Sequence, residues 1–244
     1  MKLISVNIQN NFHNQVIVDF LKKEKPDVVC FQELLEEDLA FFRNKLSMES
    51  TSYFADYVRE EDYPGLGGKR CGVAIFARKI VDCGYIFYAG NEKNSKKSFQ
   101  KWTIEGDYQK NKALVWALIE IGVGKSFKCI TSHLPWTPEG KTTPEQITAV
   151  EVMLQKLKDL GEFIFAGDMN ALRGKEAFSK IAEKYKDNIP EEYKTSLDQN
   201  LHKVKGLQNM VDGLFTTPTY KASNVKLVDG LSDHMAIVAE ITKN

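Results

Sequence analysis

The stretch with the clearest chemical potential is residues 163–170, which read Phe-Ile-Phe-Ala-Gly-Asp-Met-Asn. A short apolar run that ends in glycine is typical of a buried strand. Because the backbone leaves the core there, Asp168 and Asn170, two positions apart, can face one cleft. A carboxylate beside a carboxamide can take a proton, bind a hard metal ion or hold a phosphate oxygen. The alternative is structural, since Asp and Asn also favour the N-cap of a helix.

The same pattern, a polar side chain at the end of or inside an apolar stretch, recurs along the chain. Glu33, for example, follows the apolar run of residues 28–31. Core strands seldom bury a lone carboxylate without a partner or a metal ion, although Glu33 could also begin the polar helix that follows. One occurrence has an ordinary structural explanation, but six indicate strand ends that converge on a shared cleft. The six places are Asn7, Glu33, His133, Asp168 with Asn170, Asp212, and Asp233 with His234.

Strand and helix patterns surround these positions. Residues 52–70 favour a turn or a mobile loop, because they are polar and end in a glycine-rich run. No internal repeat, low-complexity tract or Pro/Gly linker divides the chain, so we expect one domain over residues 1–244. Helices are predicted at about 16–25, 143–160 and 175–186. Strands are predicted at 3–8, 28–31, 72–76, 80–88, 113–121, 127–131, 163–167, 210–215 and 236–241.

The helix with the clearest start signal begins near Thr143. Thr143 is expected to be its N-cap and Pro144 its first residue. Gln146, three residues after the N-cap, is expected to complete a capping box. Gly161 is expected to end the helix. This helix leads directly into the strand that ends at Asp168.

Composition limits the classes of protein to consider. Lys plus Arg and Asp plus Glu are 33 each, so no global field attracts nucleic acid or a membrane. The first residues show no signal-peptide pattern, and no apolar stretch is long enough to span a bilayer. We therefore expect a cytoplasmic monomer without stable membrane association. The four cysteines lack CxxC spacing and lie in apolar surroundings, so buried, reduced thiols are expected at Cys30, Cys71, Cys83 and Cys129.

The recurring residue types indicate one kind of chemistry. Hard oxygen ligands without cysteine suit Mg²⁺ or Mn²⁺. Histidines beside carboxylates can donate to a phosphoryl oxygen as it gathers negative charge. No Ser or Cys lies in a recognisable nucleophile elbow, so water is the expected nucleophile. Together these features favour metal-assisted hydrolysis of a phosphate ester.

Seven short motifs together resemble the endonuclease/exonuclease/phosphatase superfamily, the group with the deoxyribonuclease-I-like fold. They occur in the order found in that superfamily and cover nearly the whole chain. The resemblance implies an α/β (α+β) fold, a four-layer sandwich of two packed, mostly antiparallel β-sheets flanked by helices. The motifs are Ser5-Val6-Asn7, Cys30-Phe31-Gln32-Glu33, Gly72-Val73-Ala74-Ile75-Phe76, Thr131-Ser132-His133-Leu134, Gly167-Asp168-Met169-Asn170, Val211-Asp212-Gly213-Leu214-Phe215 and Ser232-Asp233-His234.

The resemblance also implies a metal site. Glu33 would be the principal ligand of Mg²⁺ or Mn²⁺, with Asp233 near the ion and Asn7 hydrogen-bonded within the same site. In many members the asparagine of the first strand is followed two residues later by an acid, whereas this chain has Gln9. Because a neutral Gln9 leaves fewer carboxylates for a second ion, we favour a single-ion site.

Catalytic roles are implied in the same way. Asp168 would orient or deprotonate the attacking water, and Asn170 would hold the scissile phosphate. His234 would donate to the phosphate while Asp212 orients it, since a carboxylate fixes the imidazole tautomer and stabilises its charge. His133 matches the position of a second phosphate-facing histidine in many members.

The substrate class is less constrained, because specificity in such a fold depends on loops. Many nucleases of the superfamily carry Tyr where this chain has Gly213. The lysine-rich residues 93–101, with Trp136 and Arg173, could form a rim that binds phosphates and bases, or an inositol phosphate. We favour a phosphodiesterase acting on nucleic acid. The alternatives are a phosphatase for a small molecule, inositol phosphate or lipid head group, and a non-catalytic binding module of the same fold.

Overall fold

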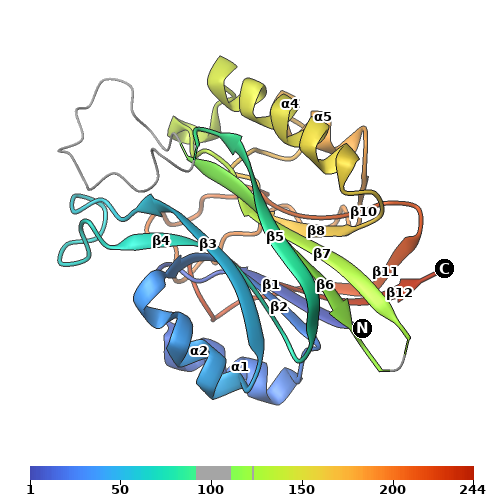
Figure 1. Ribbon diagram of the computed structural model, residues 1–244. Helices are drawn as coiled ribbons and strands as arrows, with labels where there is room; N and C mark the ends of the chain where they lie inside the picture. The colour runs from blue at the N-terminus through green and yellow to red at the C-terminus, as the bar shows by residue number, and fades with distance from the viewer. Residues whose placement is uncertain (92–110, 123) are drawn as a thin grey trace.

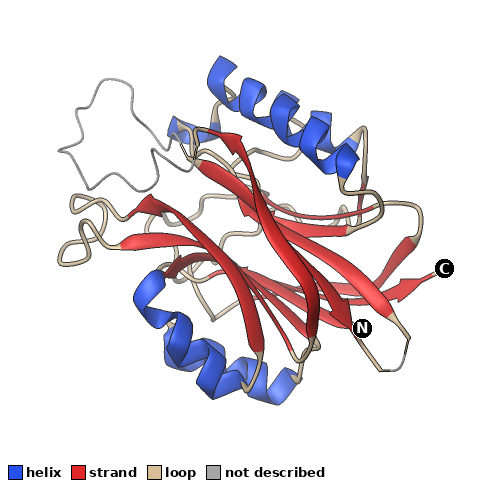
Figure 2. Ribbon diagram, viewed as in Figure 1, coloured by secondary structure: helices blue, strands red, loops and turns tan. Residues whose placement is uncertain are grey.

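A computed structural model describes residues 1–91, 111–122 and 124–244. Two β-sheets face each other, and helices cover the outer face of each sheet (Figures 1 and 2). The described chain therefore has four layers, helix, sheet, sheet and helix. The fold class expected from the sequence, a four-layer sandwich, is confirmed.

The first sheet contains six strands and carries two helices. Its strands are β1 (Lys2–Asn7), β2 (Val28–Leu35), β3 (Glu49–Tyr57), β4 (Arg70–Ala77), β11 (Tyr220–Val228) and β12 (Ala236–Lys243). They are hydrogen-bonded in the order β11-β12-β1-β2-β4-β3, with β1 and β2 parallel and the other neighbours antiparallel. The outer face is covered by α1 (Asn14–Glu24) and α2 (Leu39–Leu46), and the turn η1 (Glu36–Asp38) precedes α2.

The second sheet repeats this plan. Its strands are β5 (Ile80–Ala89), β6 (Lys112–Glu120), β7 (Ser126–His133), β8 (Ile164–Asp168), β9 (Lys186–Asp187) and β10 (Asp212–Thr216). Their order is β5-β6-β7-β8-β10-β9, and only β7 and β8 run parallel among these described strands. The outer face is covered by α4 (Pro144–Asp159) and α5 (Glu176–Ala182), and the turn η2 (Pro138–Gly140) precedes α4.

Apolar side chains alternate between two environments along the central strands. Leu3 and Val28 lie in the core between the sheets, whereas Ile4 and Val29 lie in a second core beneath α1 and α2. A period of two imposes this alternation on a strand with both faces buried. A third core, which includes Phe165, lies between the second sheet and its helices. The three cores hold both sheets in place, so the strand ends form a fixed platform.

The structure corrects several expected boundaries. Residues 52–70 are not a single loop, because β3 runs to Tyr57 before the turn begins. This edge strand is mostly half-exposed and shows no clear apolar alternation. The helix expected at 175–186 is the shorter α5. The strand expected at 210–215 begins only at Asp212, and β11, another edge strand with little buried surface, was not expected at all.

The cysteines are only partly as expected. Cys30 and Cys129 are fully buried, and burial raises the pKa of Cys30 to about 12, so this thiol stays protonated and inert. Cys71, however, is half-buried and Cys83 is exposed on β5. The expectation of four buried thiols is therefore wrong for these two. Cys83 is exposed because β5 is an edge strand whose outer positions face solvent.

The start of α4 shows half of the expected capping box. Thr143 is the N-cap, its hydroxyl accepts the backbone N–H of Gln146 at 3.2 Å, and Pro144 is the first helical residue. The Gln146 side chain does not return to the N-cap. It donates instead to the carbonyl oxygens of Pro135 at 3.0 Å and Asn170 at 2.8 Å. Gln146 therefore ties together the two loops that follow β7 and β8.

A buried ion pair joins the two sheets beside these loops. The Lys112 ammonium on β6 lies 2.5 Å from the Asp56 carboxylate on β3, and the two side chains are 2% and 18% exposed. Removing one partner of a buried pair leaves an uncompensated charge. We expect Lys112→Met to lower the free energy of unfolding by about 3–5 kcal/mol in urea denaturation.

Two further variants separate this charge effect from lost packing. Lys112→Met combined with Asp56→Leu should recover most of the loss, because replacing both members of a buried pair is often neutral. The exposed pair of Lys79 with Glu120 is the matched control, and Lys79→Met should cost less than about 1 kcal/mol. If the single and double variants at Lys112 lose equal stability, packing rather than charge dominates.

Candidate active site

The ends of strands from both sheets meet at one edge of the sandwich. Asn7 ends β1 in the first sheet, while His133 ends β7 and Asp168 ends β8 in the second. In the second sheet, His133 and Asp168 are register partners, and so are Asp168 and Asp212. The parallel and antiparallel pairings thus place the end of β7, the end of β8 and the start of β10 side by side. This convergence is what the recurring polar strand ends indicated.

Glu33 reaches this edge through an irregularity in β2. The strand continues to Leu35, so the alternative that Glu33 begins a helix is wrong. The register of β2 with β4 shifts between Phe31 and Leu34, and Glu33 itself has a φ of 57°. A bulge of this kind redirects a side chain, and a non-glycine residue in the left-handed region is costly unless its surroundings require it. The strain is located at a proposed metal ligand.

Asn7 connects acids from the two sheets. Its buried amide nitrogen donates to Glu33 Oε1 at 3.1 Å and to Asp168 Oδ2 at 3.1 Å. Its oxygen accepts the backbone N–H of Gln9 at 3.1 Å. Asn7 therefore holds the two carboxylates at a fixed separation across the gap between the sheets.

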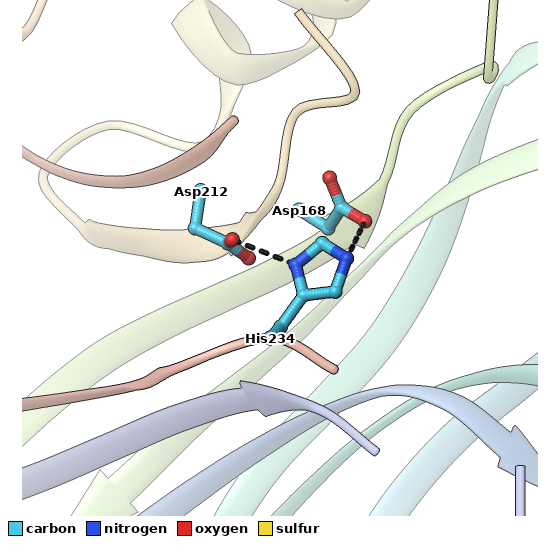
Figure 3. Close-up of side chains that lie close together, drawn as sticks. All are labelled: Asp168, Asp212 and His234. Atoms are coloured by element: carbon cyan, nitrogen blue, oxygen red, sulfur yellow. Dashed lines mark hydrogen bonds and ion pairs between the residues drawn. The ribbon is translucent and has the colours of Figure 1, made fainter. Parts of the chain in front are cut away.

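His234 lies between two aspartates (Figure 3). Its Nδ1 is 2.8 Å from Asp212 Oδ2, and its Nε2 is 3.8 Å from Asp168 Oδ2. Burial disfavours the charged imidazole, but the two carboxylates outweigh burial and raise the pKa of His234 well above its usual value. His234 is thus a charged imidazolium whose Nε2–H points into the site.

Asp168 is held by a local turn rather than by a helix. Its Oδ1 accepts the backbone N–H of Asn170 at 2.8 Å, and the next helix starts only at Glu176. The alternative that Asp168 and Asn170 cap a helix is therefore wrong. Asn170 has a φ of 44° and donates its side-chain N–H to the Leu134 carbonyl at 2.9 Å. Burial raises the pKa of Asp168 to about 6, which suits a base working near neutral pH.

His133 faces the same acids, but its imidazole is neutral, unlike that of His234. Its Nε2 lies 3.5 Å from Asp168 Oδ2 and 3.9 Å from Glu33 Oε1. Burial, assisted by the nearby charges of Lys112 and His234, lowers the pKa of His133 well below its usual value. The site therefore contains one neutral and one charged imidazole, which can take different roles.

Glu33 and Asp233 form an acidic group suited to a hard cation. Burial, together with the charge of Asp233, raises the pKa of Glu33 to about 7. Like charges crowded in a buried site indicate a missing counter-charge. Asp233 is half-buried, and its Oδ1 accepts the Ser232 hydroxyl at 3.1 Å. Because these donors are all oxygens, the group fits Mg²⁺ or Mn²⁺ better than a softer metal.

A second set of potential metal ligands lies beside the Glu33 and Asp233 group. Atoms of Asp168, Asp212 and His234 are all within 4.8 Å of one another, close enough to hold a metal ion. However, His234 Nδ1 already faces Asp212, and a charged imidazole has no free lone pair for a metal. This set is better suited to handling protons and phosphate charge than to ligation.

The acidic group of Glu33 and Asp233 should make the stability of the protein depend on pH and on Mg²⁺. The pKa of Glu33 rises from its ordinary 4.5 to about 7, so the folded protein binds more protons than the unfolded chain between these values. Stability must then fall as pH rises through that window. In EDTA we expect a higher Tm at about pH 5 than at about pH 7.5, with Mg²⁺ raising Tm most at the higher pH.

The control for this prediction is Glu33→Gln, because His133, with its lowered pKa, works in the opposite direction. The variant should lose most of the Mg²⁺-dependent gain in Tm. It should lose only part of the fall in stability between the two pH values, because the raised pKa values of Asp168 and His234 act in the same direction as that of Glu33. Equal responses to Mg²⁺ in the wild type and the variant would contradict the assignment of Glu33 as the principal ligand.

Two residues that sequence analysis missed hold the histidine segment in place. The buried Ser196 hydroxyl accepts the backbone N–H groups of Val211 and Asp212 at 3.1 Å each, and its carbonyl accepts the N–H of Met235 at 2.7 Å. The Asp198 backbone N–H donates to the Asp233 carbonyl at 2.9 Å. Residues 196–198 therefore join the Asp212 segment to the Asp233–His234 segment.

The Asp198 side chain strengthens this junction. Its carboxylate accepts the backbone N–H groups of Asn200, Leu201 and Gly230 at 2.7, 2.8 and 2.6 Å. These bonds outweigh burial and lower the pKa of Asp198. In the sequence, Asp198 shows only the turn preference of an ordinary loop aspartate.

The substrate rim expected from the sequence is only partly observable. Residues 93–101, with their lysines, lie outside the described residues. Trp136 is 42% exposed, three residues beyond His133. Arg173 was expected to contact phosphate, but its guanidinium is already paired. It lies 2.9 Å from the Asp187 carboxylate and donates to the Ile189 carbonyl.

The sequence matches the Endonuclease/Exonuclease/phosphatase family over residues 4–234. The chain belongs to this family, whose members are phosphoester hydrolases that generally use a divalent metal ion. No curated protein shows significant sequence similarity to it. None of the helices in the described ranges is long and apolar enough to cross a membrane.

Solved structures with similar folds include proteins of different specificity. The human Nocturnin catalytic domain with bound sulfate has a TM-score of 0.73 at 15% identity, covering 100% of this chain and 94% of that chain. D. rerio TDP2 with a single-strand DNA product scores 0.70 at 18% identity, covering 100% and 99%. The Bacteroides thetaiotaomicron mannosyl-6-phosphatase scores 0.69 at 15% identity, covering 99% of each chain. At these identities the likeness shows the fold alone.

Proposed function

We propose that this protein is a Mg²⁺-dependent phosphodiesterase that hydrolyses nucleic acid by attack of an activated water. The observation that carries the proposal is the hydrogen-bonded array around His234. There a charged imidazole and a carboxylate with a pKa of about 6 lie beside the Glu33 acidic group. A base, a phosphate-facing cation and a set of hard-metal ligands are the parts that this reaction needs.

Each residue then has a defined task. Asp168 accepts a proton from water as the water oxygen bonds to phosphorus and the ester bond breaks. The leaving oxygen keeps the electron pair of that bond and takes a proton from solvent. Asn7 and the Asn170 backbone N–H hold the Asp168 carboxylate in position. The charged His234, oriented by Asp212, donates from Nε2 to a non-bridging phosphoryl oxygen. These roles use positioned charge and proton transfer rather than a covalent intermediate.

The remaining residues bind the metal and the phosphate. Glu33 and Asp233 would hold the ion, within the site that Asn7 braces. When bound, Mg²⁺ supplies Lewis-acid stabilisation of the phosphoryl oxygens. The neutral His133 can donate a hydrogen bond without adding charge. The Asn170 side chain stands at the end of β8, where it can reach the phosphate by exchanging its bond to Leu134.

The class of substrate is argued separately from the chemistry. A protein with this fold, D. rerio TDP2, binds a single-strand DNA product, which supports a nucleic-acid substrate. The second candidate is a phosphatase for a small phosphate ester, which the equal numbers of acidic and basic residues favour, because non-specific nucleic-acid binding usually uses a basic excess. We also propose that the enzyme is a cytoplasmic monomer, as expected from the sequence.

One substrate panel separates these candidates. Hydrolysis is measured with Mg²⁺ and with EDTA on single-stranded DNA, duplex DNA with blocked 5′ ends, poly(A) RNA, inositol phosphates and mannose 6-phosphate. We expect metal-dependent cleavage of a nucleic acid. Turnover of a small phosphate ester alone would keep the mechanism and overturn the substrate class. No turnover of any member would favour a non-catalytic binding module.

A further inference from the structure

Two aromatic rings from separate loops pack against each other beyond the end of β1. Phe12 lies between β1 and α1, and Tyr63 lies between β3 and β4. Their ring centroids are 5.7 Å apart, at an interplanar angle of 39°. Tyr63 is half-buried, whereas Phe12 is 56% exposed. The pair therefore presents one ring to solvent with a second ring behind it.

Contacts of Gln9 connect this ring pair to the proposed metal ligands. The Gln9 side chain lies close enough to the Tyr63 phenol to act on its pKa. The Gln9 backbone N–H donates to Asn7 Oδ1 at 3.1 Å, and Asn7 in turn donates to Glu33 Oε1 at 3.1 Å. Gln9 Oε1 also lies 3.1 Å from His13 Nε2. Gln9, which replaces the acid expected at this position, thus links an aromatic surface to the site.

The loop that carries Tyr63 is tied down by its own contacts. The Glu60 carboxylate accepts the backbone N–H groups of Gly65 and Gly67 at 2.8 Å each. The Tyr63 backbone N–H donates to the Arg59 carbonyl at 3.1 Å. The charges of Glu33 and Asp233, with burial, raise the pKa of Tyr63, which agrees with a protonated phenol directed toward those acids.

We propose that the exposed face of Phe12, supported by Tyr63, binds a nucleobase of the substrate next to the scissile phosphate. The proposal rests on the proposed function and extends it by naming a specificity-determining surface. Stacking on an aromatic ring tolerates any base, since every base has a π face. Such a surface does not require the global basic charge that this chain lacks.

The test couples a change in the protein to a change in the ligand. A thymidine tetranucleotide and its four singly abasic analogues are titrated into the Asp168→Asn protein in Mg²⁺ by isothermal titration calorimetry. We expect removal of the base at one position to raise Kd about tenfold. This difference in Kd between the parent and abasic ligands should disappear when Phe12→Ala is added. Phe12→Leu, which keeps apolar bulk without a ring, should also lose most of it, whereas Tyr63→Phe should keep it.

The control variant is Val81→Ala, because Val81 is 54% exposed on the distant edge strand β5. It should bind all five ligands like the parent protein. If Phe12→Ala weakens binding of the intact and abasic tetranucleotides equally, or changes the binding of neither, the proposed surface is wrong. Wild-type hydrolysis of the same tetranucleotide is measured separately. Coupled binding without cleavage would overturn the proposed function alone, and cleavage without coupling would overturn this inference alone.

Discussion

Asp168→Asn is expected to lower kcat by at least about 100-fold on any phosphodiester that the wild type cleaves. The amide cannot take the proton of the attacking water, although it keeps the size of the carboxylate. The same change should leave Tm unchanged or higher, because burial raises the pKa of Asp168 to about 6 and an ionised carboxylate there is destabilising at neutral pH. Steady-state kinetics and thermal unfolding of one preparation test both parts.

A matched control for this variant is Asp187→Asn. Burial also raises the pKa of Asp187, but that side chain is paired with Arg173, away from the site. We expect its kcat to stay within about twofold of the wild type, as for other changes remote from the reacting groups. Full activity in Asp168→Asn would remove Asp168 from the mechanism, whereas equal losses in the two variants would indicate a general effect of altering buried acids.

Asp212→Asn is expected to reduce kcat by about 100-fold or more by changing the charge of His234. The Asp212 carboxylate, 2.8 Å from Nδ1, is the leading favourable contribution that raises the pKa of this histidine. Without that charge the pKa falls, so the imidazole loses its proton as pH rises through the lower value. The variant should therefore be least impaired near pH 6, just above the point where Asp168 becomes protonated, and should show a new decline in kcat as pH rises further.

The pH profile distinguishes this role from a structural one. A variant that merely distorts the site would lower kcat by the same factor at every pH. His234→Gln, which cannot become charged, should be as impaired as Asp212→Asn at high pH but should not recover at low pH. A wild-type pH profile in Asp212→Asn would show that the carboxylate does not control the histidine.

Much of the site could be anticipated because its residues occupy a repeated kind of position. Apolar strands that end in Asp168, His133 or Asn7 must leave the core at a sheet edge, and these ends lie together in the structure. The four-layer fold followed from the ordered motifs. Edge strands such as β3 and β11 were missed, because few of their residues are buried and the apolar alternation that marks a strand is weak.

Other features depend on contacts that no local pattern encodes. Lys112 is buried because Asp56, on the other sheet, compensates its charge, whereas lysines are usually exposed. Glu33 enters the site through a bulge and a positive φ that its neighbours in sequence do not signal. Ser196 acts through backbone N–H groups about fifteen residues away, which a scan for reactive side chains does not detect.

The central claim, attack of water at phosphorus, is tested most directly by following oxygen from the solvent. The preferred phosphodiester is hydrolysed in ¹⁸O-labelled water with Mg²⁺, and the products are weighed by mass spectrometry. We expect one solvent oxygen in the phosphoryl product of the wild type, no product in EDTA, and at least about 100-fold slower formation of product with Asp168→Asn. A phosphoryl product without label, or cleavage that continues in EDTA, would contradict it.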